Sequence, residues 1–265
     1  MTKKFNPKNS VCVITGGSSG IGRAIAQELI TQGAKQIINI DVVDPDYDCE
    51  YFYCNILDSN QYDIVLGTIH DQYTDINMIC GNVGQCILGN YQTSISQWKQ
   101  IFDLNLHSHI QLVQRFLPSM INKQSGTMLF TASAAGLLTM MGSATYAASK
   151  SALLSFAEVL AYEHTLDGVG IHALCPEGVN TAMAEYDDPY TNQIKKGKLI
   201  GDYMECDAVA KTCVDQMSQG RFRIYTHQTT EAAVYNKHSD NQSWLKRMSS
   251  IYDENIRHFF AKKVD

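Results

Sequence analysis

The residues best suited to move a proton in this 265-residue chain are Tyr146 and Lys150, which stand four positions apart. On an α-helix that spacing puts both side chains on one face. A phenol has a pKa near 10, so acid/base work at neutral pH needs roughly 4 kcal/mol of added phenolate stabilisation. A neighbouring ammonium group supplies part of it. The pair therefore predicts proton transfer at Tyr146, although surface helices also carry Tyr-x3-Lys by chance.

Two further polar residues precede this pair. Ser133 lies thirteen positions before Tyr146, just after the apolar run Thr127–Thr131, which reads as a strand. Open α/β sheets bind ligands at the carboxyl ends of their strands, so this hydroxyl is expected at a ligand site. Asn105 lies inside a long helical pattern over residues 94–122. An asparagine there is usually exposed to solvent or marks a local kink.

A glycine-rich turn separates the first apolar run from the first amphipathic one. Gly16, Gly20 and Gly22 stand in the stretch TGGSSGIG, which follows Ser10–Thr15 and opens Ile21–Gln32. Glycine permits the positive φ of a tight turn and a close approach of the backbone to a ligand. The start of a helix offers unpaired N–H groups to a pyrophosphate. An ordinary Gly/Ser-rich turn is the alternative, but the position between a strand and a helix favours dinucleotide binding.

Asp41 ends the second strand-like run, nineteen residues beyond Gly22. A carboxylate at this place accepts hydrogen bonds from an adenosine ribose, whereas a 2′-phosphate would meet like charge. Three more aspartates follow within residues 42–48, and neither that segment nor residues 17–19 contains Lys or Arg. A solvated aspartate at a strand end is the alternative. We predict NAD(H) rather than NADP(H) as the cofactor.

Short apolar runs alternate with longer amphipathic ones along the chain. The strand-like runs are Ser10–Thr15, Gln36–Ile40, Tyr51–Cys54, Ile76–Cys80, Thr127–Thr131, Gly170–Leu174 and Phe222–Thr226. The helical patterns cover Ile21–Gln32, Asn60–Tyr73, residues 94–122, Tyr146–Thr165, Cys206–Ser218 and Asn241–Phe260. This alternation predicts right-handed crossovers and a parallel sheet with helices on both faces. We therefore expect a single α/β domain over residues 1–265, built on a doubly wound parallel sheet of about seven strands.

Composition and charge exclude several classes of protein. Apolar residues make up 45% and charged ones 18%, which argues against wholesale disorder. The net charge is −6 and no Lys/Arg cluster stands out, so we expect no nucleic-acid partner and no membrane surface. No apolar run approaches a membrane span, and the N-terminus has no secretory pattern. The eight cysteines contain no CxxC pair and are typical of reduced thiols in a cytoplasmic protein.

In their order and spacing, these motifs resemble the short-chain dehydrogenase/reductase family in its single-domain form, over roughly residues 9–183. The stretch Thr15–Gly22 matches the family's TGxxxGIG, and residues 81–84 (GNVG) resemble its NNAG. Phe102–Asn105 matches the segment with the family's catalytic Asn, and Tyr146–Lys150 matches its YxxxK. The resemblance implies a Rossmann-type fold and an oxidoreductase.

The resemblance also implies roles for individual residues. Tyr146 would be the general acid/base, and Ser133 would bind the substrate oxygen. Lys150 would hold the nicotinamide ribose and lower the pKa of Tyr146, and Asn105 would position a relay water. The residues that bind NAD would be Gly16, Ser18, Ser19, Gly20, Ile21, Gly22, Asp41, Asn55, Ile56, Asn82, Gly84, Tyr146, Lys150, Val179 and Thr181. The chain would form a homodimer or homotetramer through the helices over about 100–122 and 146–165.

The chain departs from the family pattern at four places. Gly81 replaces the first Asn of NNAG, and Asn55 replaces an Asp near the adenine. Glu177 replaces a glycine beside the nicotinamide, and the last strand lacks the usual Asp-Gly-Gly finish. We expect a substrate-binding segment at about residues 182–205 and a C-terminal helical extension at about 240–262.

We predict an enzyme that interconverts a secondary alcohol and a ketone with NAD(H). No metal site is expected, because His107 and His109 are two positions apart and do not face each other on a helix. Two alternatives stay open: an NADPH-dependent carbonyl or enoyl reductase, and a non-catalytic dinucleotide-binding regulator. An apolar substrate such as a steroid, fatty-acid derivative or cyclic alcohol would meet a pocket of Leu137, Leu138, Met140, Met141, Met183 and Tyr186.

Overall fold

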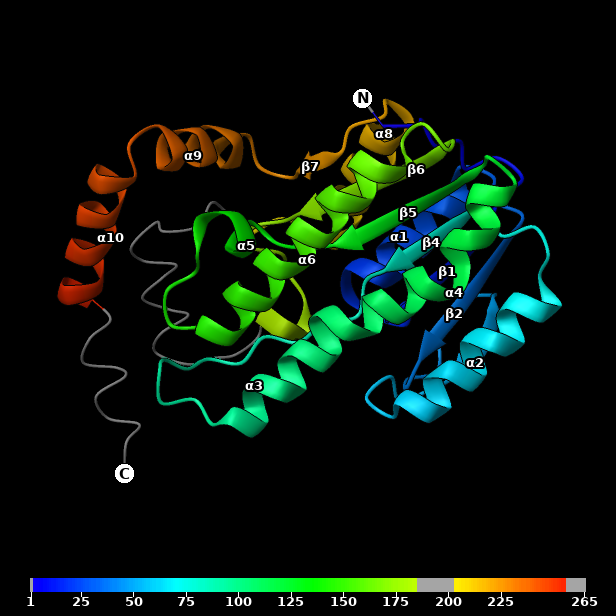
Figure 1. Ribbon diagram of the computed structural model, residues 1–265, viewed down its shortest axis with the longest axis horizontal. Coiled ribbons are helices and arrows are strands. Elements are labelled where there is room, and N and C mark those ends of the chain that lie inside the picture. Colours follow the sequence, from blue (N-terminus) through cyan, green and yellow to red (C-terminus); the bar gives the residue numbers. More distant parts are fainter. Residues whose placement is uncertain (1, 185–202, 256–265) are drawn as a thin grey trace.

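The structure is a computed structural model that describes residues 2–184 and 203–255 (Figure 1). Its centre is one sheet of seven parallel strands in the order β3-β2-β1-β4-β5-β6-β7. The strands are β1 (Val11–Thr15), β2 (Gln36–Asp41), β3 (Glu50–Tyr53), β4 (Met78–Gly81), β5 (Gly126–Thr131), β6 (Val169–Cys175) and β7 (Arg223–Tyr225). The strand order reverses between β1 and β4, where sheets of this kind bind ligands. The predicted doubly wound parallel sheet is confirmed.

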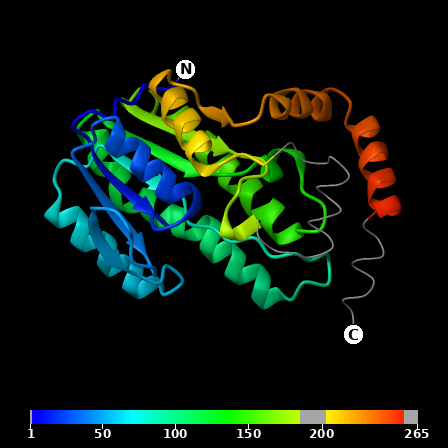
Figure 2. The ribbon, with the colours of Figure 1, turned by 180° about the vertical axis from the view of Figure 1, so that it is seen from behind.

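Helices cover both faces of the sheet. On one face, which Figure 2 shows in front, lie α1 (Gly20–Thr31) and α8 (Cys206–Ser218), packed against each other. The opposite face carries α2 (Ser59–Gln72), α4 (Ser108–Asn122) and α6 (Ala144–His164). Each face therefore closes over its own hydrophobic layer.

Strand β1 shows why its run is apolar without interruption. Val11 and Val13 pack with the layer beneath α2, α4 and α6, whereas Cys12 and Ile14 pack with the layer beneath α1 and α8. Successive side chains of a strand point to opposite faces. Burial on both faces therefore removes the polar alternation of a half-exposed strand.

The helical pattern over residues 94–122 is one run with an interruption. Helix α3 (Ile95–Phe102) passes through a π-helical turn, η1 (Asp103–His107), into α4. Such turns are rare and occur often at functional sites. Asn105 lies in the middle of this turn and is fully buried. The asparagine therefore lies at an irregular turn of the helix, and its side chain is not exposed to solvent.

Three elements are not expected from periodicity. They are α5 (Ala134–Leu138), η2 (Ala182–Ala184) and α9 (Gln228–Ser239). The first two are shorter than the window in which a helical period shows. Helix α9 buries only Thr230 and Val234, so it carries no broad apolar stripe.

The predicted C-terminal helix is α10 (Asn241–Asn255), and residues 256–265 lie outside the described residues. Figure 1 shows α9 and α10 extending from β7 past α5. The side chains of Trp244, Met248, Ile251 and Tyr252 are half-buried. They therefore do not belong to the sheet's core.

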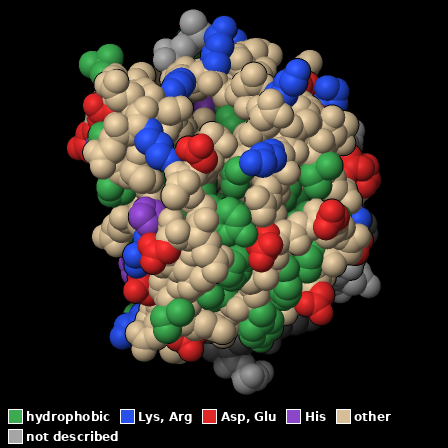
Figure 3. Space-filling model, turned by 90° about the vertical axis from the view of Figure 1, so that its right-hand side faces the viewer, with side chains coloured by type: hydrophobic (Ala, Val, Ile, Leu, Met, Phe, Trp, Pro, Cys, Tyr) green, Lys and Arg blue, Asp and Glu red, His purple; other side chains and the backbone are tan. Residues whose placement is uncertain are grey.

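The surface seen from the right-hand side of Figure 1 mixes charge types. Figure 3 shows acidic and basic side chains interspersed with hydrophobic ones on this face. Arg115 of α4 pairs with Asp63 of α2 at 2.7 Å, and an exposed pair of this kind contributes at most about 1 kcal/mol. Within residues 2–184 and 203–255, no helix combines the length and the hydropathy needed to cross a membrane.

Candidate active site

The glycine turn joins β1 to α1 and has a backbone shape that glycine adopts most easily. Gly16 has φ +68° and Gly20 has φ +53°, both in the left-handed region. A Cβ added at Gly22 would overlap the Gly16 carbonyl oxygen, so the start of α1 packs directly on the turn. The sequence pattern therefore corresponds to a cradle of bare backbone.

Two side chains that motif matching misses hold this turn. Asn39, fully buried in β2, accepts a hydrogen bond from Gly17 N at 2.9 Å and donates one to the Ser18 hydroxyl at 2.8 Å. Tyr47 donates its hydroxyl proton to the Gly17 carbonyl at 2.9 Å. Buried polar groups of this kind are almost always satisfied by the structure around them. A polar residue inside an apolar strand is the signal that points to Asn39.

Asn82 follows β4 and connects the ends of its two neighbouring strands, β1 and β5. Its amide nitrogen donates to the carbonyls of Gly16 at 3.1 Å and Thr15 at 3.2 Å. Its amide oxygen accepts from the Thr131 hydroxyl at 3.0 Å. The side chain of this predicted cofactor residue therefore orders the cradle between β1 and β5.

The first turn of α1 is open to an anion. The N-cap residue Ser19 makes no side-chain capping bond, and this fully described helix has no acidic residue in its first turn. Thr181 lies over the turn, since a Cβ at Gly20 would be 3.3 Å from Thr181 Cγ2. An uncapped helix N-terminus attracts phosphate. The residues present therefore fit the pyrophosphate of a dinucleotide.

Asp41 stands at the carboxyl end of β2 with a fixed carboxylate. Backbone N–H groups donate to it from Ser18 at 2.9 Å, Val42 at 2.7 Å and Val43 at 3.3 Å. The side chain stays partly exposed, and a carboxylate has about four lone pairs to offer. The remaining lone pairs suit the hydroxyls of a ribose.

Asn55 and Ile56 follow β3, next to β2. Asn55 is exposed, and its amide oxygen accepts a hydrogen bond from Leu57 N at 3.2 Å. Ile56 is buried in the hydrophobic core. Its side chain therefore supports the site from beneath, and only its backbone can face a cofactor.

Tyr146 and Lys150 lie on one face of α6, as their spacing predicts. Lys150 Nζ is 5.8 Å from the centre of the Tyr146 ring and donates a hydrogen bond to the Thr131 carbonyl at 2.7 Å. Ser133 lies close enough to Tyr146 to lower the pKa of its phenol by hydrogen bonding. The structure thus brings the phenol, the ammonium and the hydroxyl together at the carboxyl end of β5.

Burial changes the acidity of both titratable groups. It lowers the pKa of Lys150 to about 8, because a buried ammonium loses hydration. Burial also raises the pKa of the Tyr146 phenol, Cys86 raises it further, and the bond with Ser133 lowers it. This direction is opposite to the lowering expected from Lys150. Desolvation of the phenolate is the largest of the effects on this pKa.

Asn105 uses its amide to order the segment after β4. Its oxygen accepts from Gln85 N at 2.9 Å, and its nitrogen donates to the Gln85 carbonyl and the Ser149 hydroxyl, each at 3.0 Å. A Cβ at Gly84 would lie 3.1 Å from Lys150 Nζ and 3.2 Å from Asn105 Oδ1. Asn105 is therefore placed beside the lysine, and the relay water implied for it stays a prediction.

The replacement at Gly81 has a structural partner in His109 of α4. A Cβ at Gly81 would overlap His109 Nδ1. Burial, and after it the charge of Lys150, lowers the pKa of His109 to about 3, so the ring is neutral. Its Nε2 lies 3.1 Å from the Val83 carbonyl, the geometry of an N–H donor. His109 therefore fills the space beside residue 81 and holds the segment that carries Gly84.

Cys86 is a residue of this site that no motif indicates. It affects the pKa of Tyr146 and of Lys150, which places its thiol near both groups. Its Sγ lies 3.4 Å from the Ser143 hydroxyl. The only sequence signal is its position two residues after Gly84.

The residues after β6 contact the far end of the predicted substrate-binding segment, residues 182–205. Val179 is buried and forms a β-bridge with Met204. Asn180 N donates to the Met204 carbonyl at 2.9 Å. The two ends of residues 182–205 therefore meet, and residues 185–202 lie outside the described residues.

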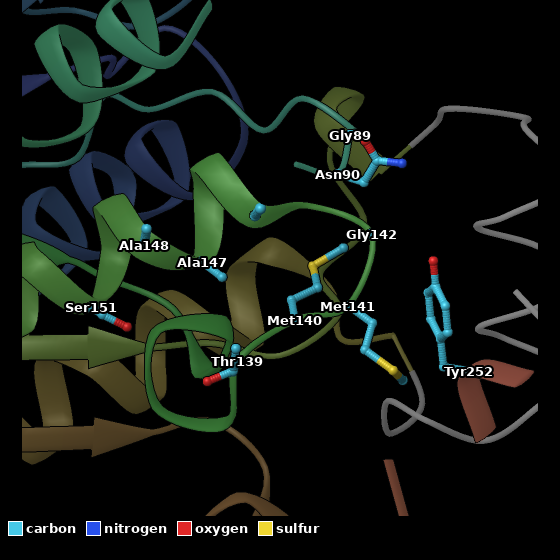
Figure 4. A pocket seen from close by; sticks show the side chains of 11 residues that line it. Gly89, Asn90, Thr139, Met140, Met141, Gly142, Ala147, Ala148, Ser151 and Tyr252 are labelled. Atoms are coloured by element: carbon cyan, nitrogen blue, oxygen red, sulfur yellow. The ribbon is translucent and has the colours of Figure 1, made fainter. Parts of the chain in front are cut away.

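A cavity of about 390 Å³ opens beside the N-terminal half of α6 (Figure 4). Met140 and Met141 line it, as the sequence predicts, and Tyr252 of α10 forms another part of its wall. The rest of the lining comes mainly from small residues of α6 and from the turn over residues 139–142. The cavity is therefore largely apolar, which suits a carbon skeleton.

Other residues expected in the apolar pocket lie elsewhere. Leu137 is buried in the hydrophobic core and Leu138 packs against that core, because α5 turns both toward the protein interior. Met183 is 40% exposed, and Tyr186 lies outside the described residues. The expected pocket is therefore only partly the observed one.

A parallel sheet of this order, with a glycine turn and a Tyr–Lys–Ser group at its carboxyl edge, defines an oxidoreductase. The sequence model of the family described as short chain dehydrogenase matches residues 10–191. The chain belongs to this family. The match contains every motif that the sequence resemblance used.

Relatives and solved structures agree with this assignment. An uncharacterized oxidoreductase of Staphylococcus epidermidis is 27% identical over 190 residues, covering 68% of this chain and 83% of the relative. The 3-oxoacyl-(acyl-carrier-protein) reductase FabG of Salmonella typhimurium is 28% identical over 227 residues, covering 80% and 92%.

Two solved structures share the fold. A short-chain dehydrogenase/reductase of Burkholderia phymatum in complex with NAD superimposes with TM-score 0.76 at 24% identity, covering 90% of this chain and 96% of that one. A short-chain dehydrogenase of Burkholderia cenocepacia in complex with NADP has TM-score 0.76 at 15% identity, covering 92% and 98%. These likenesses show the fold alone, and the two cofactors differ.

Proposed function

We propose that this protein is an NAD(H)-dependent oxidoreductase that interconverts a secondary alcohol and a ketone. The observation that carries the proposal is the grouping of Tyr146 with Ser133 and Lys150 at the sheet edge that also holds the glycine turn. A bound nicotinamide supplies or accepts the hydride. The chain's own residues orient the substrate oxygen and move its proton.

In the reducing direction Tyr146 donates its proton to the carbonyl oxygen, while the Ser133 hydroxyl donates a hydrogen bond to the same atom. The raised pKa of Tyr146 keeps that proton on the phenol until it is needed. The Lys150 ammonium then stabilises the phenolate that forms, and its burial strengthens this interaction. In the oxidising direction the phenolate accepts the proton of the alcohol.

Tyr146→Phe tests the proposal, because it keeps the ring and removes only the oxygen. We expect turnover to fall by about 10²- to 10⁴-fold while NADH binding, followed by fluorescence, persists. Tyr162→Phe is the matched control, since Tyr162 lies on the same helix and is 74% exposed. If wild type and Tyr146→Phe are equally inert on a broad substrate panel while both bind NADH, the regulator alternative replaces the enzyme.

The preference for NAD(H) is supported by the charges around the adenosine end. Asp41 presents a carboxylate there. Arg23 of α1 makes two hydrogen bonds to Asp46, at 2.7 and 2.8 Å, so its positive charge is already paired with a carboxylate. Asp41→Ala should raise the ratio of kcat/KM with NADPH to kcat/KM with NADH, and Asp44→Ala should change it less. A wild-type enzyme that prefers NADPH would contradict this assignment.

An NADPH-dependent carbonyl or enoyl reductase is the second candidate. One observation favours it: a relative is named a 3-oxoacyl-(acyl-carrier-protein) reductase. Cofactor titration with a 3-oxoacyl thioester and with simple ketones separates the two candidates.

We also propose that the substrate has a mainly apolar skeleton. The methionines and Tyr252 around the cavity support this, as does the lack of charged residues among its lining within the described chain. Turnover should be higher for steroid, hydroxy-fatty-acid and cyclic alcohols than for sugars and other polyols. A preference confined to polyols would refute it.

The proposal also covers the oligomeric state of the protein and its compartment in the cell. We infer a homodimer or homotetramer, because the apolar Val159 is 44% exposed on α6. A reducing compartment such as the cytoplasm suits the eight cysteines, none of which forms a disulfide in the described part of the chain. Light scattering of the wild type should give a multiple of 29.6 kDa, and Val159→Glu should lower it. A wild-type mass of one chain would contradict the assembly.

A further inference from the structure

One face of α9 is turned toward α5, the short helix that begins after Ser133. Thr230, Val234 and Lys237 share this face through their spacing of four and three residues. Thr230 is fully buried, and Val234 belongs to the same hydrophobic core as Leu137 of α5. The contacts of the two polar residues fall at opposite ends of α5.

The first contact lies at the start of α5. The Thr230 hydroxyl donates a hydrogen bond to Glu177 Oε1 at 2.5 Å. Glu177 follows Pro176, whose carbonyl accepts from Ala134 N at 2.9 Å and lies 3.5 Å from the Ser133 hydroxyl. The glutamate that replaces the family's glycine thus connects α9 to the carbonyl beside Ser133.

The second contact lies at the end of α5. The Lys237 ammonium donates hydrogen bonds to the Leu137 carbonyl at 2.7 Å and to the Thr139 hydroxyl at 2.9 Å. Carbonyls in the last turn of a helix need partners from outside it. Thr139 has φ +65°, a conformation that β-branched residues avoid. Lys237 therefore holds a strained turn that leads directly to Met140 and the cavity.

Helix α5 can pass a shift at its end to its beginning. It has only five residues, and Ser133 is its N-cap, accepting a hydrogen bond from Ala135 N at 3.0 Å. A Cβ at Gly136 would lie 2.8 Å from the backbone of Lys150, so α5 also packs closely on the catalytic segment of α6. The protein interior at such a contact is too dense to absorb a displacement locally.

We propose that Lys237 is a positioning residue, which holds the end of α5 and thereby sets the Ser133 hydroxyl toward Tyr146 and the turn over residues 139–142 toward the substrate. This inference rests on the proposed function, in which Ser133 binds the substrate oxygen. Lys237 itself touches neither the reacting atoms nor Tyr146. The groups whose charge or hydrogen bonding acts on Tyr146 are Cys86 and Ser133, with Lys150 at 5.8 Å from its ring.

Lys237→Met tests the role, because it removes the ammonium group and keeps the length of the side chain. We expect kcat for alcohol oxidation to fall about tenfold, since small misplacements of reacting groups are costly. The pH at half-maximal oxidation should move upward, because a weaker bond from Ser133 no longer lowers the pKa of Tyr146. The dissociation constant of NADH should not change, and Lys237→Arg should restore most of the activity.

Lys246→Met is the matched control, since it removes the same charge from the exposed side of α10. Hydrogen exchange over residues 133–142 provides a readout that does not depend on turnover. We expect faster exchange there in Lys237→Met and unchanged exchange in Lys246→Met. If the wild type is inactive on every substrate, the proposed function fails, yet the exchange still decides whether Lys237 holds α5.

Three results would overturn the inference. One is wild-type exchange over residues 133–142 in Lys237→Met, and another is an unshifted pH profile in an active Lys237→Met enzyme. If Lys237→Met folds poorly, the double variant Lys237→Met/Thr139→Gly replaces it, because glycine adopts the positive φ without help. This double variant should recover folding and part of kcat, and its failure to recover either is the third contrary result.

Discussion

Acidification to pH 5 should destabilise this protein through two buried histidines. Burial lowers the pKa of His109 to about 3 and that of His172 to about 4, whereas the unfolded chain has a value near 6.5. His109 Nε2 lies 3.1 Å from the Val83 carbonyl, and His172 Nδ1 lies 2.6 Å from the Arg221 carbonyl. Both rings are therefore held in the neutral form.

The sign follows from proton binding. Between the folded and unfolded pKa values the unfolded state binds more protons, so the free energy of unfolding falls as the pH drops below 6.5. At pH 5 each histidine costs about 2 kcal/mol. Together they remove about 4 kcal/mol from a total that is usually about 5–15 kcal/mol. The melting temperature should fall by roughly 10 °C.

Urea unfolding at pH 7 and pH 5 measures this loss. The wild type should lose about 4 kcal/mol and His172→Asn about 2 kcal/mol between the two conditions. His107→Asn is the control, because its side chain is 58% exposed, and it should behave as the wild type. Equal unfolding free energies at the two pH values, or a wild-type pH dependence in His172→Asn, would refute the reasoning.

Three further predictions follow from the site. Gly81→Ala should lower the free energy of unfolding by about 2 kcal/mol, because the added Cβ overlaps His109 Nδ1. In thermal unfolding, adding His109→Ala should recover part of this loss. An unchanged melting temperature in the single variant would speak against the contact. Asn39→Ala should lower the free energy of unfolding by about 1–3 kcal/mol, since it leaves Gly17 N without its hydrogen bond. It should also weaken NADH binding in fluorescence titrations. Normal NADH affinity would show that the turn keeps its conformation without Asn39. Alcohol oxidation should rise with pH above neutrality, because a raised pKa makes the base form of Tyr146 scarce at pH 7, and a rate that falls from pH 7 to 9 would contradict this.

The centre of the sheet could be predicted from the sequence because β1, β4, β5 and β6 are buried on both faces. The apolar runs ending at Thr15, Thr131 and Leu174 correspond to β1, β5 and β6 within one or two residues. The shared face of Tyr146 and Lys150 could be predicted because a spacing of four on a helix places two side chains on one side. Ser133 was placed by its position after a strand, which local pattern alone reveals.

Contacts between distant parts of the chain could not be predicted from the sequence. Helix α9 has no apolar stripe, and its hydrogen bonds to Glu177 and Leu137 join residues 53 and 100 positions apart. Asn39 and Cys86 belong to no motif, and their roles depend on what packs around them.

The amino-acid sequence by itself determined the order of the elements, the glycine turn and the kinds of groups that gather at the sheet edge. These properties depend on neighbouring residues, through periodicity and turn chemistry. Only the tertiary structure decided the raised pKa of Tyr146, the burial of Asn105 in a π turn and the contact of α9 with α5. Desolvation and long-range hydrogen bonds arise when remote segments pack together, so no local pattern encodes them.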